Sequence, residues 1–154
     1  MAMTRDDFRP VGDRPDVDFR RVGADAGLLD VALAVTARGF EAPREMFTSL
    51  FSTGMQAEGL DLWLAYVDDV PVSTATGLVF GESVGIFDVA TPPEHRRKGY
   101  GAAVSAKVLT EGFAPGASYA YLQSSEMGFP VYKALGFRTV STYVVHTRPD
   151  ADDS

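Results

Sequence analysis

The sequence predicts an α/β fold in which a mixed, mostly antiparallel central sheet is flanked by helices. Two stretches with helical spacing come first, three strand-like stretches joined by short turns follow, and helices then alternate with strands. Short turns join antiparallel neighbours, whereas a helix between two strands is typical of parallel ones. The 154 residues suffice for one domain with its own hydrophobic core.

The two ends of the chain lack the periodicity of packed elements. Residues 1–16 contain two prolines, a glycine and several aspartates, so we expect a loose N-terminal arm before a domain of residues 17–148. Residues 149–154 are polar and rich in aspartate, and they predict a disordered tail.

The first third of the domain predicts one strand and two helices. Residues 17–22 form a short strand, and apolar side chains recur at helical spacing over 24–38, where Gly39 ends the pattern. A second helix is expected over 42–55, because Pro43 fits a first helical turn and three apolar side chains share one face.

Seven further elements follow from the same patterns. They are, in order, strands over 61–67, 70–80 and 84–90, a helix over 99–113, a strand over 119–123, a helix over 128–135 and a strand over 137–145. The first three strands form an antiparallel meander, because only short turns separate them. The predicted order is therefore β-α-α-β-β-β-α-β-α-β.

Composition narrows the classes of function. The chain has no cysteine, which removes disulfides, cysteine-based metal sites and an acyl-cysteine intermediate. Two histidines are too few for most histidine-rich metal sites, so no metal is expected. The net charge of −7 argues against binding to nucleic acid and suits a cationic substrate such as an amine, although it also serves solubility.

The sequence also bears on location. No apolar run approaches the ~20 residues that a membrane span needs. The polar stretch over 1–15 lacks the apolar core of a secretory signal. We therefore expect a cytoplasmic protein without a membrane partner.

The stretch between the third meander strand and the next helix carries the chemistry. A strand ends, a basic loop follows, and the helix opens with Gly99 and Gly101. The first amides of a helix lack intrahelical partners and carry partial positive charge, and glycine lets a ligand approach that backbone closely. With Arg97 and Lys98 beside them, these amides predict a cradle for a pyrophosphate.

Three other motifs fit less well. A Walker loop ends in Gly-Lys-Ser or Gly-Lys-Thr, but alanines follow Gly101. A dinucleotide fingerprint needs glycine or alanine three places after Gly101, where Val104 stands. The run from Gly81 to Gly85 has the Gly-x-Ser-x-Gly spacing of a hydrolase nucleophile elbow, but a strand rather than a helix follows it. A serine hydrolase using Ser83 is kept only as an alternative.

Two segments together resemble the GNAT superfamily of acyl-CoA-dependent N-acetyltransferases. Arg96-x-x-Gly99-x-Gly101-Ala102 resembles its acyl-CoA signature, and Tyr132-x-x-Leu135-Gly136-Phe137 resembles its Tyr-x-x-Leu-Gly-Phe ending. The similarity covers roughly residues 17–146 and implies a GNAT-like acyltransferase fold with acetyl-CoA (coenzyme A) as the cofactor. It implies direct transfer of an acetyl group to a primary amine of a small molecule or peptide.

The resemblance also implies roles for residues. Val89, Ala90 and Thr91 would pair by their backbone with the pantetheine arm of the cofactor. Tyr132 would lie near the thioester sulfur. The backbone from Arg97 to Ala102 would hold the cofactor's pyrophosphate. The full set of cofactor-binding residues implied in this loop and helix start is Arg96, Arg97, Lys98, Gly99, Tyr100, Gly101 and Ala102.

The chain departs from the family pattern just before the last predicted helix. Many members have an asparagine at the position of Ser125, and this chain contains no asparagine. Ser125, or its neighbour Ser124, would then make a weaker cofactor contact. Gly128 stands where alanine is common, a change that is tolerable beside a ligand.

Amine acylation needs a base for the amine and a proton for the leaving thiolate. A lysine-like amine has a pKa of about 10.4, so its deprotonation at pH 7 costs about 4.6 kcal/mol. Asp88, one residue before the proposed pantetheine segment, is the predicted base, and Glu126, Glu82 and Glu45 are further options. A phenol pKa of about 10 exceeds a thiol pKa of about 8.5, so we expect Tyr132 to donate a hydrogen bond rather than transfer its proton fully.

Several questions stay open at this level. A binding module of the same fold that senses acyl-CoA without turnover is an alternative to the enzyme. The acceptor pocket would be formed largely by residues 24–60, and no motif there identifies the acceptor. A homodimer is a possible assembly, since dimers are the commonest homo-oligomers.

Overall fold

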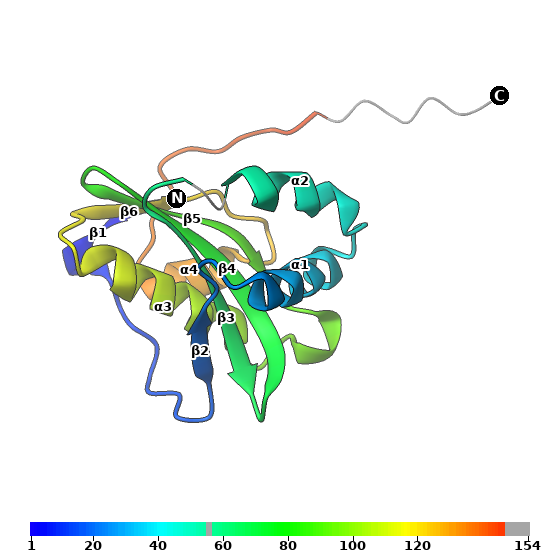
Figure 1. The fold of residues 1–154 in the computed structure, drawn as a ribbon. Coiled ribbons are helices and arrows are strands. Elements are labelled where there is room, and N and C mark those ends of the chain that lie inside the picture. Colours follow the sequence, from blue (N-terminus) through cyan, green and yellow to red (C-terminus); the bar gives the residue numbers. More distant parts are fainter. Residues whose placement is uncertain (55–56, 147–154) are drawn as a thin grey trace.

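The computed structural model describes residues 1–54 and 57–146 and contains one six-stranded sheet between two pairs of helices (Figure 1). The elements are β1 (Ala2–Thr4), η1 (Arg5–Asp7), β2 (Asp18–Arg21), α1 (Ala26–Phe40), α2 (Glu45–Gly54), β3 (Leu60–Val67), β4 (Val70–Phe80), β5 (Ser83–Ala90), η2 (Pro93–His95), α3 (Tyr100–Phe113), β6 (Tyr119–Leu122) and α4 (Phe129–Leu135). Strand order is β1-β6-β5-β4-β3-β2. Among the described strands, β5 and β6 pair in parallel and all other neighbours are antiparallel. The predicted fold class is confirmed.

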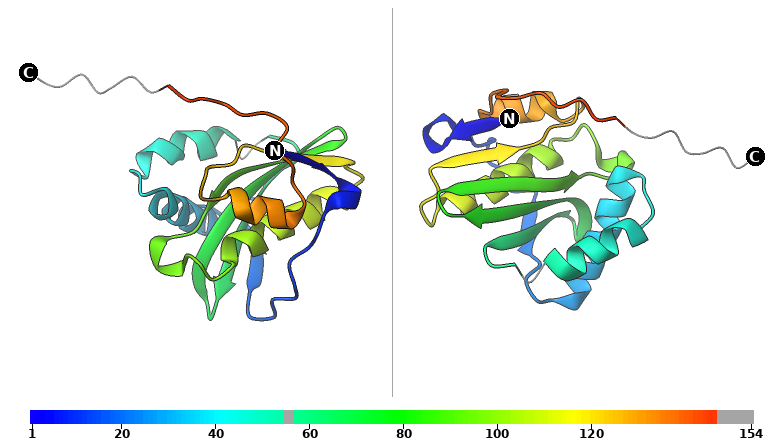
Figure 2. Two further views of the ribbon diagram at one scale, coloured as in Figure 1. Left: turned by 180° about the vertical axis from the view of Figure 1, so that it is seen from behind. Right: turned by 90° about the horizontal axis from the view of Figure 1, so that it is seen from above.

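Helices cover both faces of the sheet (Figure 2). Along β3, Leu62, Leu64 and Tyr66 pack with α1 and α2, whereas Trp63 and Ala65 belong to the core formed with α3 and α4. Side chains alternate between the two faces of a strand, so a strand that is buried on both faces must be apolar throughout. This is why β3 is apolar from Leu62 to Val67 and contributes side chains to two separate core clusters.

α1 is fixed at its start by a cap and near its end by a close contact. The Asp25 side chain accepts hydrogen bonds from two amides of the first turn, at 2.9 and 3.0 Å. The helix continues one residue past Gly39, its expected end. A Cβ atom at Gly39 would lie 2.7 Å from the Cβ of Ala90 and 2.9 Å from the backbone nitrogen of Thr91. Glycine therefore lets α1 contact the end of β5.

The first residues differ from the expected loose arm. β1 pairs antiparallel with β6, with Ala2 opposite Tyr121 and Thr4 opposite Tyr119. Met3 is 2% exposed and joins the core that α3 and α4 form with the sheet. Three residues are too few to show a strand pattern, so the sequence could not reveal β1. The prolines and Gly12 lie in the loop that follows η1.

The final strand predicted over 137–145 is wrong. In the described chain only Arg138 makes a strand-like pair there, an isolated bridge with Ala2. β1 occupies the place beside β6, and within the described chain residues 139–145 pair with no strand. Val140, Tyr143, Val144 and Val145 are exposed as a result. The expected disordered tail, 149–154, lies outside the described residues.

Replacing Met3 by alanine tests whether β1 belongs to the folded core. The buried thioether leaves a cavity, so the free energy of unfolding should fall by about 2–4 kcal/mol in urea titrations followed by circular dichroism. Met46→Ala is the matched control, because Met46 is 66% exposed and its loss should cost about 0.5 kcal/mol or less. Equal, small losses for the two variants would show that β1 contributes nothing to the core.

Candidate functional site

The second half of β5 has a free edge. β5 pairs with β6 only from Ser83 to Ile86, opposite Tyr119 to Leu122. Beyond Ile86, β5 pairs with β4 alone in the described chain, up to the pair of Thr74 with Ala90. An unpaired strand edge presents backbone amides and carbonyls to an extended polar ligand. Val89 and Ala90, predicted to bind the pantetheine arm, lie on this edge.

A bulge in the same half of β5 brings Asp88 out of the regular strand. Thr74 pairs with Ala90 and Thr76 with Phe87, so Asp88 and Val89 lie opposite one residue of β4. Asp88 has a φ of 51°, which is uncommon outside glycine but tolerated by aspartate. Bulges of this kind leave one residue unpaired and redirect its side chain, often beside active sites.

Asp88 is half-buried, and this burial raises the pKa of its carboxyl group. Within the described residues, no hydrogen bond or ion pair reaches the carboxylate. A carboxylate that has lost water without gaining a cation is a stronger base than an exposed aspartate. The position therefore suits the base that the sequence predicted, and it suits a cationic amine as well.

The connection from β5 to α3 presents backbone amides. Arg97 and Gly99 adopt the left-handed conformation, with φ of 64° and 80°, and Gly99 forms the N-cap of α3. In the described part of the chain, the amides from Gly99 to Ala102 donate to no protein acceptor, as expected for a first helical turn. A Cβ atom at Gly101 would lie 3.4 Å from the Thr91 hydroxyl, an ordinary contact. The first turn of α3 therefore faces the end of β5 with open amides.

The side chains of the three basic residues in this loop, Arg96, Arg97 and Lys98, have different surroundings. The Arg96 guanidinium donates to the carbonyls of Thr91 at 3.1 Å and of Gly39 at 2.8 Å, and so fastens the loop to α1. Lys98 donates to the carbonyl of Glu94 at 3.1 Å. Arg97 is exposed and has no ion pair among the described residues. The sequence predicted charge at the cradle from Arg97 and Lys98. Of the three cations, Arg97 alone has no side-chain hydrogen bond or ion pair within the described residues.

Tyr132 lies on α4, and its side chain is directed towards α3. Its side chain is 9% exposed, and burial raises the pKa of the phenol to about 12, although proximity to the Ser105 hydroxyl opposes that rise. Ser105 Oγ is itself buried and has no hydrogen bond of ordinary geometry in the described structure. Ser105 lies one helical turn beyond Gly101, about 6 Å along the axis of α3. The phenol is therefore close to the cradle and does not point to solvent.

Ser125 and Gly128 support Tyr132 through the start of α4. Ser125 Oγ accepts a hydrogen bond from the Gly128 amide at 3.1 Å. A Cβ atom at Gly128 would lie 2.8 Å from Cε2 of Tyr132, so glycine leaves space for the ring. The sequence suggested a ligand as the neighbour of Gly128, and the structure shows that the neighbour is the Tyr132 ring.

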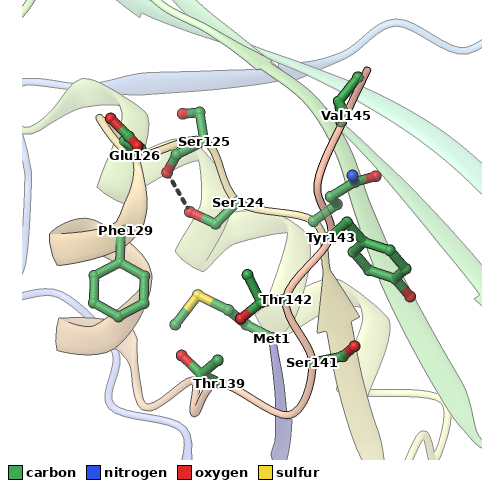
Figure 3. Close-up of a pocket in the computed structure, with 11 residues that line it drawn as sticks. Met1, Ser124, Ser125, Glu126, Phe129, Thr139, Ser141, Thr142, Tyr143 and Val145 are labelled. Carbon is green, nitrogen blue, oxygen red and sulfur yellow. Dashed lines mark hydrogen bonds between the residues drawn. The ribbon is translucent and has the colours of Figure 1, made fainter.

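A cavity of about 480 Å³ is lined in part by the loop that follows β6 (Figure 3). Glu126 and Phe129 lie on one wall, and Tyr143 and Val145 lie on the other. The full lining is Met1, Gln123, Ser124, Ser125, Glu126, Phe129, Thr139, Ser141, Thr142, Tyr143 and Val145. Pockets of 300–1,000 Å³ suit small molecules, as a rough guide. Because its walls come from distant segments, no sequence motif could have indicated it.

Other sequence candidates lie apart from this site. Glu82 and Ser83 are at the start of β5, five or six residues from Asp88, which is roughly 17–20 Å along a strand. Ser83 donates to the carbonyl of Phe80 at 2.9 Å and is followed by a strand, so it lacks the geometry of a nucleophile elbow. Glu45 is exposed at the start of α2.

The described residues contain neither a cluster of metal ligands nor a membrane-spanning helix. No group of three or more histidine, aspartate or glutamate side chains in that part of the chain is placed to hold a metal ion. Among the described helices, none combines the length and apolar character that a membrane crossing requires.

The chain belongs to the acetyltransferase (GNAT) family, whose pattern matches residues 31–137. A comparison with the curated proteins finds no match. A GCN5-related N-acetyltransferase from Kribbella flavida is 25% identical with a TM-score of 0.69, and the match covers 89% of this chain and 52% of that one. The present chain thus spans about half of that neighbour's length.

Two neighbours of similar length share the fold. A predicted acetyltransferase from Clostridium acetobutylicum, solved with acetyl-CoA, is 19% identical with a TM-score of 0.67, over 85% of this chain and 96% of that one. An aminoglycoside acetyltransferase from an uncultured soil sample is 21% identical with a TM-score of 0.69, over 86% and 96%. The predicted family and fold are confirmed.

Asp88→Asn should stabilise the protein at neutral and alkaline pH. Because burial raises the folded-state pKa of Asp88, its ionisation costs stability as pH rises through that pKa. The asparagine variant avoids this cost and tolerates the left-handed backbone, so its Tm should exceed that of the wild type at pH 8. The difference should shrink as pH falls and vanish below the ordinary aspartate pKa of 3.8, where the carboxyl is protonated in the folded and unfolded states.

Asp69→Asn provides the control, since Asp69 also has a positive φ, of 59°, but lies in an exposed turn. It should show no gain in Tm at pH 8. A pH-independent difference for Asp88→Asn would mean that the carboxylate is not destabilised by burial.

Proposed function

We propose that the chain is an acetyltransferase that moves the acetyl group of acetyl-CoA directly to a primary amine of a small molecule. The observation that carries the proposal is that three features adjoin α3. They are the end of the free edge of β5, where Thr91 lies beside Gly101, the open amides of the first turn, and the Tyr132 phenol beside Ser105. These features match an extended polyamide arm, a pyrophosphate and a developing thiolate, respectively.

In this proposal the backbone of Val89, Ala90 and Thr91 binds the pantetheine arm. The amides from Gly99 to Ala102 bind the pyrophosphate, and the free guanidinium of Arg97 adds charge at its solvent side. The Arg96 and Lys98 side chains act by holding the loop, because both already donate to backbone carbonyls. The Ser125 hydroxyl has accepted one hydrogen bond and keeps its proton for the arm.

Acetyl-CoA supplies the acyl group as a thioester, whose carbonyl carbon accepts the amine lone pair as the carbon–sulfur bond breaks. Asp88 takes the amine proton directly or through one water, and its raised pKa improves it as a base. Tyr132 donates a hydrogen bond where charge develops on sulfur. With its pKa at about 12, full proton transfer to a thiolate of pKa about 8.5 costs roughly 5 kcal/mol, so the hydrogen bond is the favoured role.

A small cationic acceptor is supported by charge and space. The net charge of −7 attracts an ammonium group before it loses its proton. The cavity beside Ser124 and Ser125 contains Glu126 and several hydroxyls, groups that bind amines and alcohols. An enzyme whose name specifies an aminoglycoside acceptor shares the fold. A peptide amine is the competing acceptor, and an assay panel should include both kinds.

A thermal-shift titration with turnover assays tests the proposal. At about 100 times its Kd, acetyl-CoA stabilises a protein by about 2.7 kcal/mol, which raises Tm by several degrees. Gly101→Glu should abolish this shift, because it puts a carboxylate at the cradle. Gly101→Ala controls for stability, since a Cβ there makes only ordinary contacts. Absence of both a shift and CoA release with every amine would contradict the proposal.

Tyr132→Phe separates an enzyme from a non-catalytic binding module. The phenol acts mainly in the transition state, so turnover should fall by about 10²–10⁴-fold while the Kd of acetyl-CoA barely changes. Initial rates with a validated acceptor and calorimetric titration of both proteins provide the comparison. Full activity in the variant would remove Tyr132 from the mechanism. Equal cofactor binding without turnover in either protein would identify a binding module.

A further inference from the structure

Arg14 belongs to the loop between η1 and β2, and it lies against the phosphate cradle although 84 residues separate it from Lys98. Its Nη1 donates to the carbonyl of Lys98 at 3.0 Å. Its guanidinium carbon lies 5.2 Å from the centre of the Tyr100 ring. A Cβ atom at Gly99 would lie 3.1 Å from the same Nη1. Arg14 therefore contacts three consecutive residues at the start of α3.

Asp16 holds the guanidinium in this position. Its two carboxylate oxygens accept from Nε and Nη2 of Arg14, each at 2.8 Å, which leaves Nη1 directed at the Lys98 carbonyl. A two-point contact of this kind fixes the plane of a guanidinium, which an ammonium group cannot reproduce. Asp16 offsets the charge of Arg14. Arg14 therefore acts at this position by orienting the Lys98 carbonyl rather than by adding net positive charge.

The contact has a geometric consequence for the cradle. In a planar trans peptide, the carbonyl of one residue and the amide of the next point in opposite directions. Arg14 binds the Lys98 carbonyl, so it sets the direction of the Gly99 amide on the far side of that peptide. Gly99 is in the left-handed conformation with a φ of 80°, which the backbone leaves easily unless it is held.

We propose that Arg14 is a positioning residue for the cofactor's pyrophosphate, which orients the first amide of the cradle through the Lys98 carbonyl. This inference rests on the proposed function. The effect is confined to the part of the cofactor that the cradle contacts. The binding of acetyl-CoA therefore depends on Arg14, whereas the binding of S-acetylpantetheine, which lacks the pyrophosphate, does not.

The test compares the two acetyl donors in wild type and Arg14→Gln. For acetyl-CoA the variant should raise KM and Kd about tenfold, a factor that one hydrogen bond from a charged donor can supply, with kcat within about twofold. For S-acetylpantetheine, KM should stay within about twofold. A merely structural role for Arg14 would weaken both donors alike, and unchanged acetyl-CoA affinity would likewise overturn the inference.

Arg20→Gln is the matched control. Arg20 also pairs with the aspartate two residues away, at 2.7 Å from Asp18, and lies over an aromatic ring, 3.9 Å from the centre of Tyr66. It contacts Asp69 rather than the cradle, at 2.8 Å. Acetyl-CoA affinity should therefore be unchanged in this variant, whereas a tenfold loss would show that such pairs act only through general stability.

Asp16→Asn distinguishes the orientation of the Arg14 guanidinium from its charge. It also serves as the test if Arg14→Gln fails to fold. Removing the carboxylate makes the cradle more positive but releases the guanidinium, so acetyl-CoA should bind several-fold more weakly if Arg14 acts by position. Tighter or unchanged binding would overturn the proposal. A wild-type protein that binds no CoA would refute the proposed function instead, which keeps the two failures distinct.

Discussion

Parallel pairing between β5 and β6 stops at Ile86, and the site depends on that limit. β6 has only four residues, and the chain then leaves the sheet for the loop that leads to α4. β5 continues for four more residues and carries the bulge at Asp88 and Val89. Had β6 been as long as β5, the backbone groups from Phe87 to Ala90 would have been paired in a regular ladder and would not be available to a ligand.

In the proposed function, two basic residues of the loop between β5 and α3 serve the anion site without contacting the anion. Arg96 holds the loop to the end of α1, and Lys98 bonds back to Glu94. The positive potential at the first turn of α3 then comes largely from amides that need no side-chain ordering. Gly39 completes this support, since its missing side chain lets α1 approach Thr91 and present a carbonyl to Arg96.

Much of the fold was readable from the sequence because most elements are regular and several have clear ends. The meander strands, α3 and α4 lie within two residues of their predicted bounds. The start of α3 at the two glycines was also predictable, because glycine at a helix start leaves a local sequence signal. The errors concern pairing: β1 is too short to leave a pattern, and 139–145 has the composition of a strand but no neighbour. The contacts of Arg96 with Gly39 and of Arg14 with Lys98 join residues far apart in the chain, so no local pattern could predict them. The space that Gly128 leaves for the Tyr132 ring depends on how α4 begins.

β1 also sets the order in which the protein can be completed. Ala2 lies beside Tyr121 and bridges to Arg138, so the sheet edge joins residues separated by about four-fifths of the chain. During synthesis, β1 emerges before β6 and α4, so its pairing must wait until both have been made. Contacts of such long sequence separation are slow to form, because the loop between them must close first. The Met3 side chain stays exposed until this pairing forms. We therefore expect the pairing of β1 to be a late step of folding.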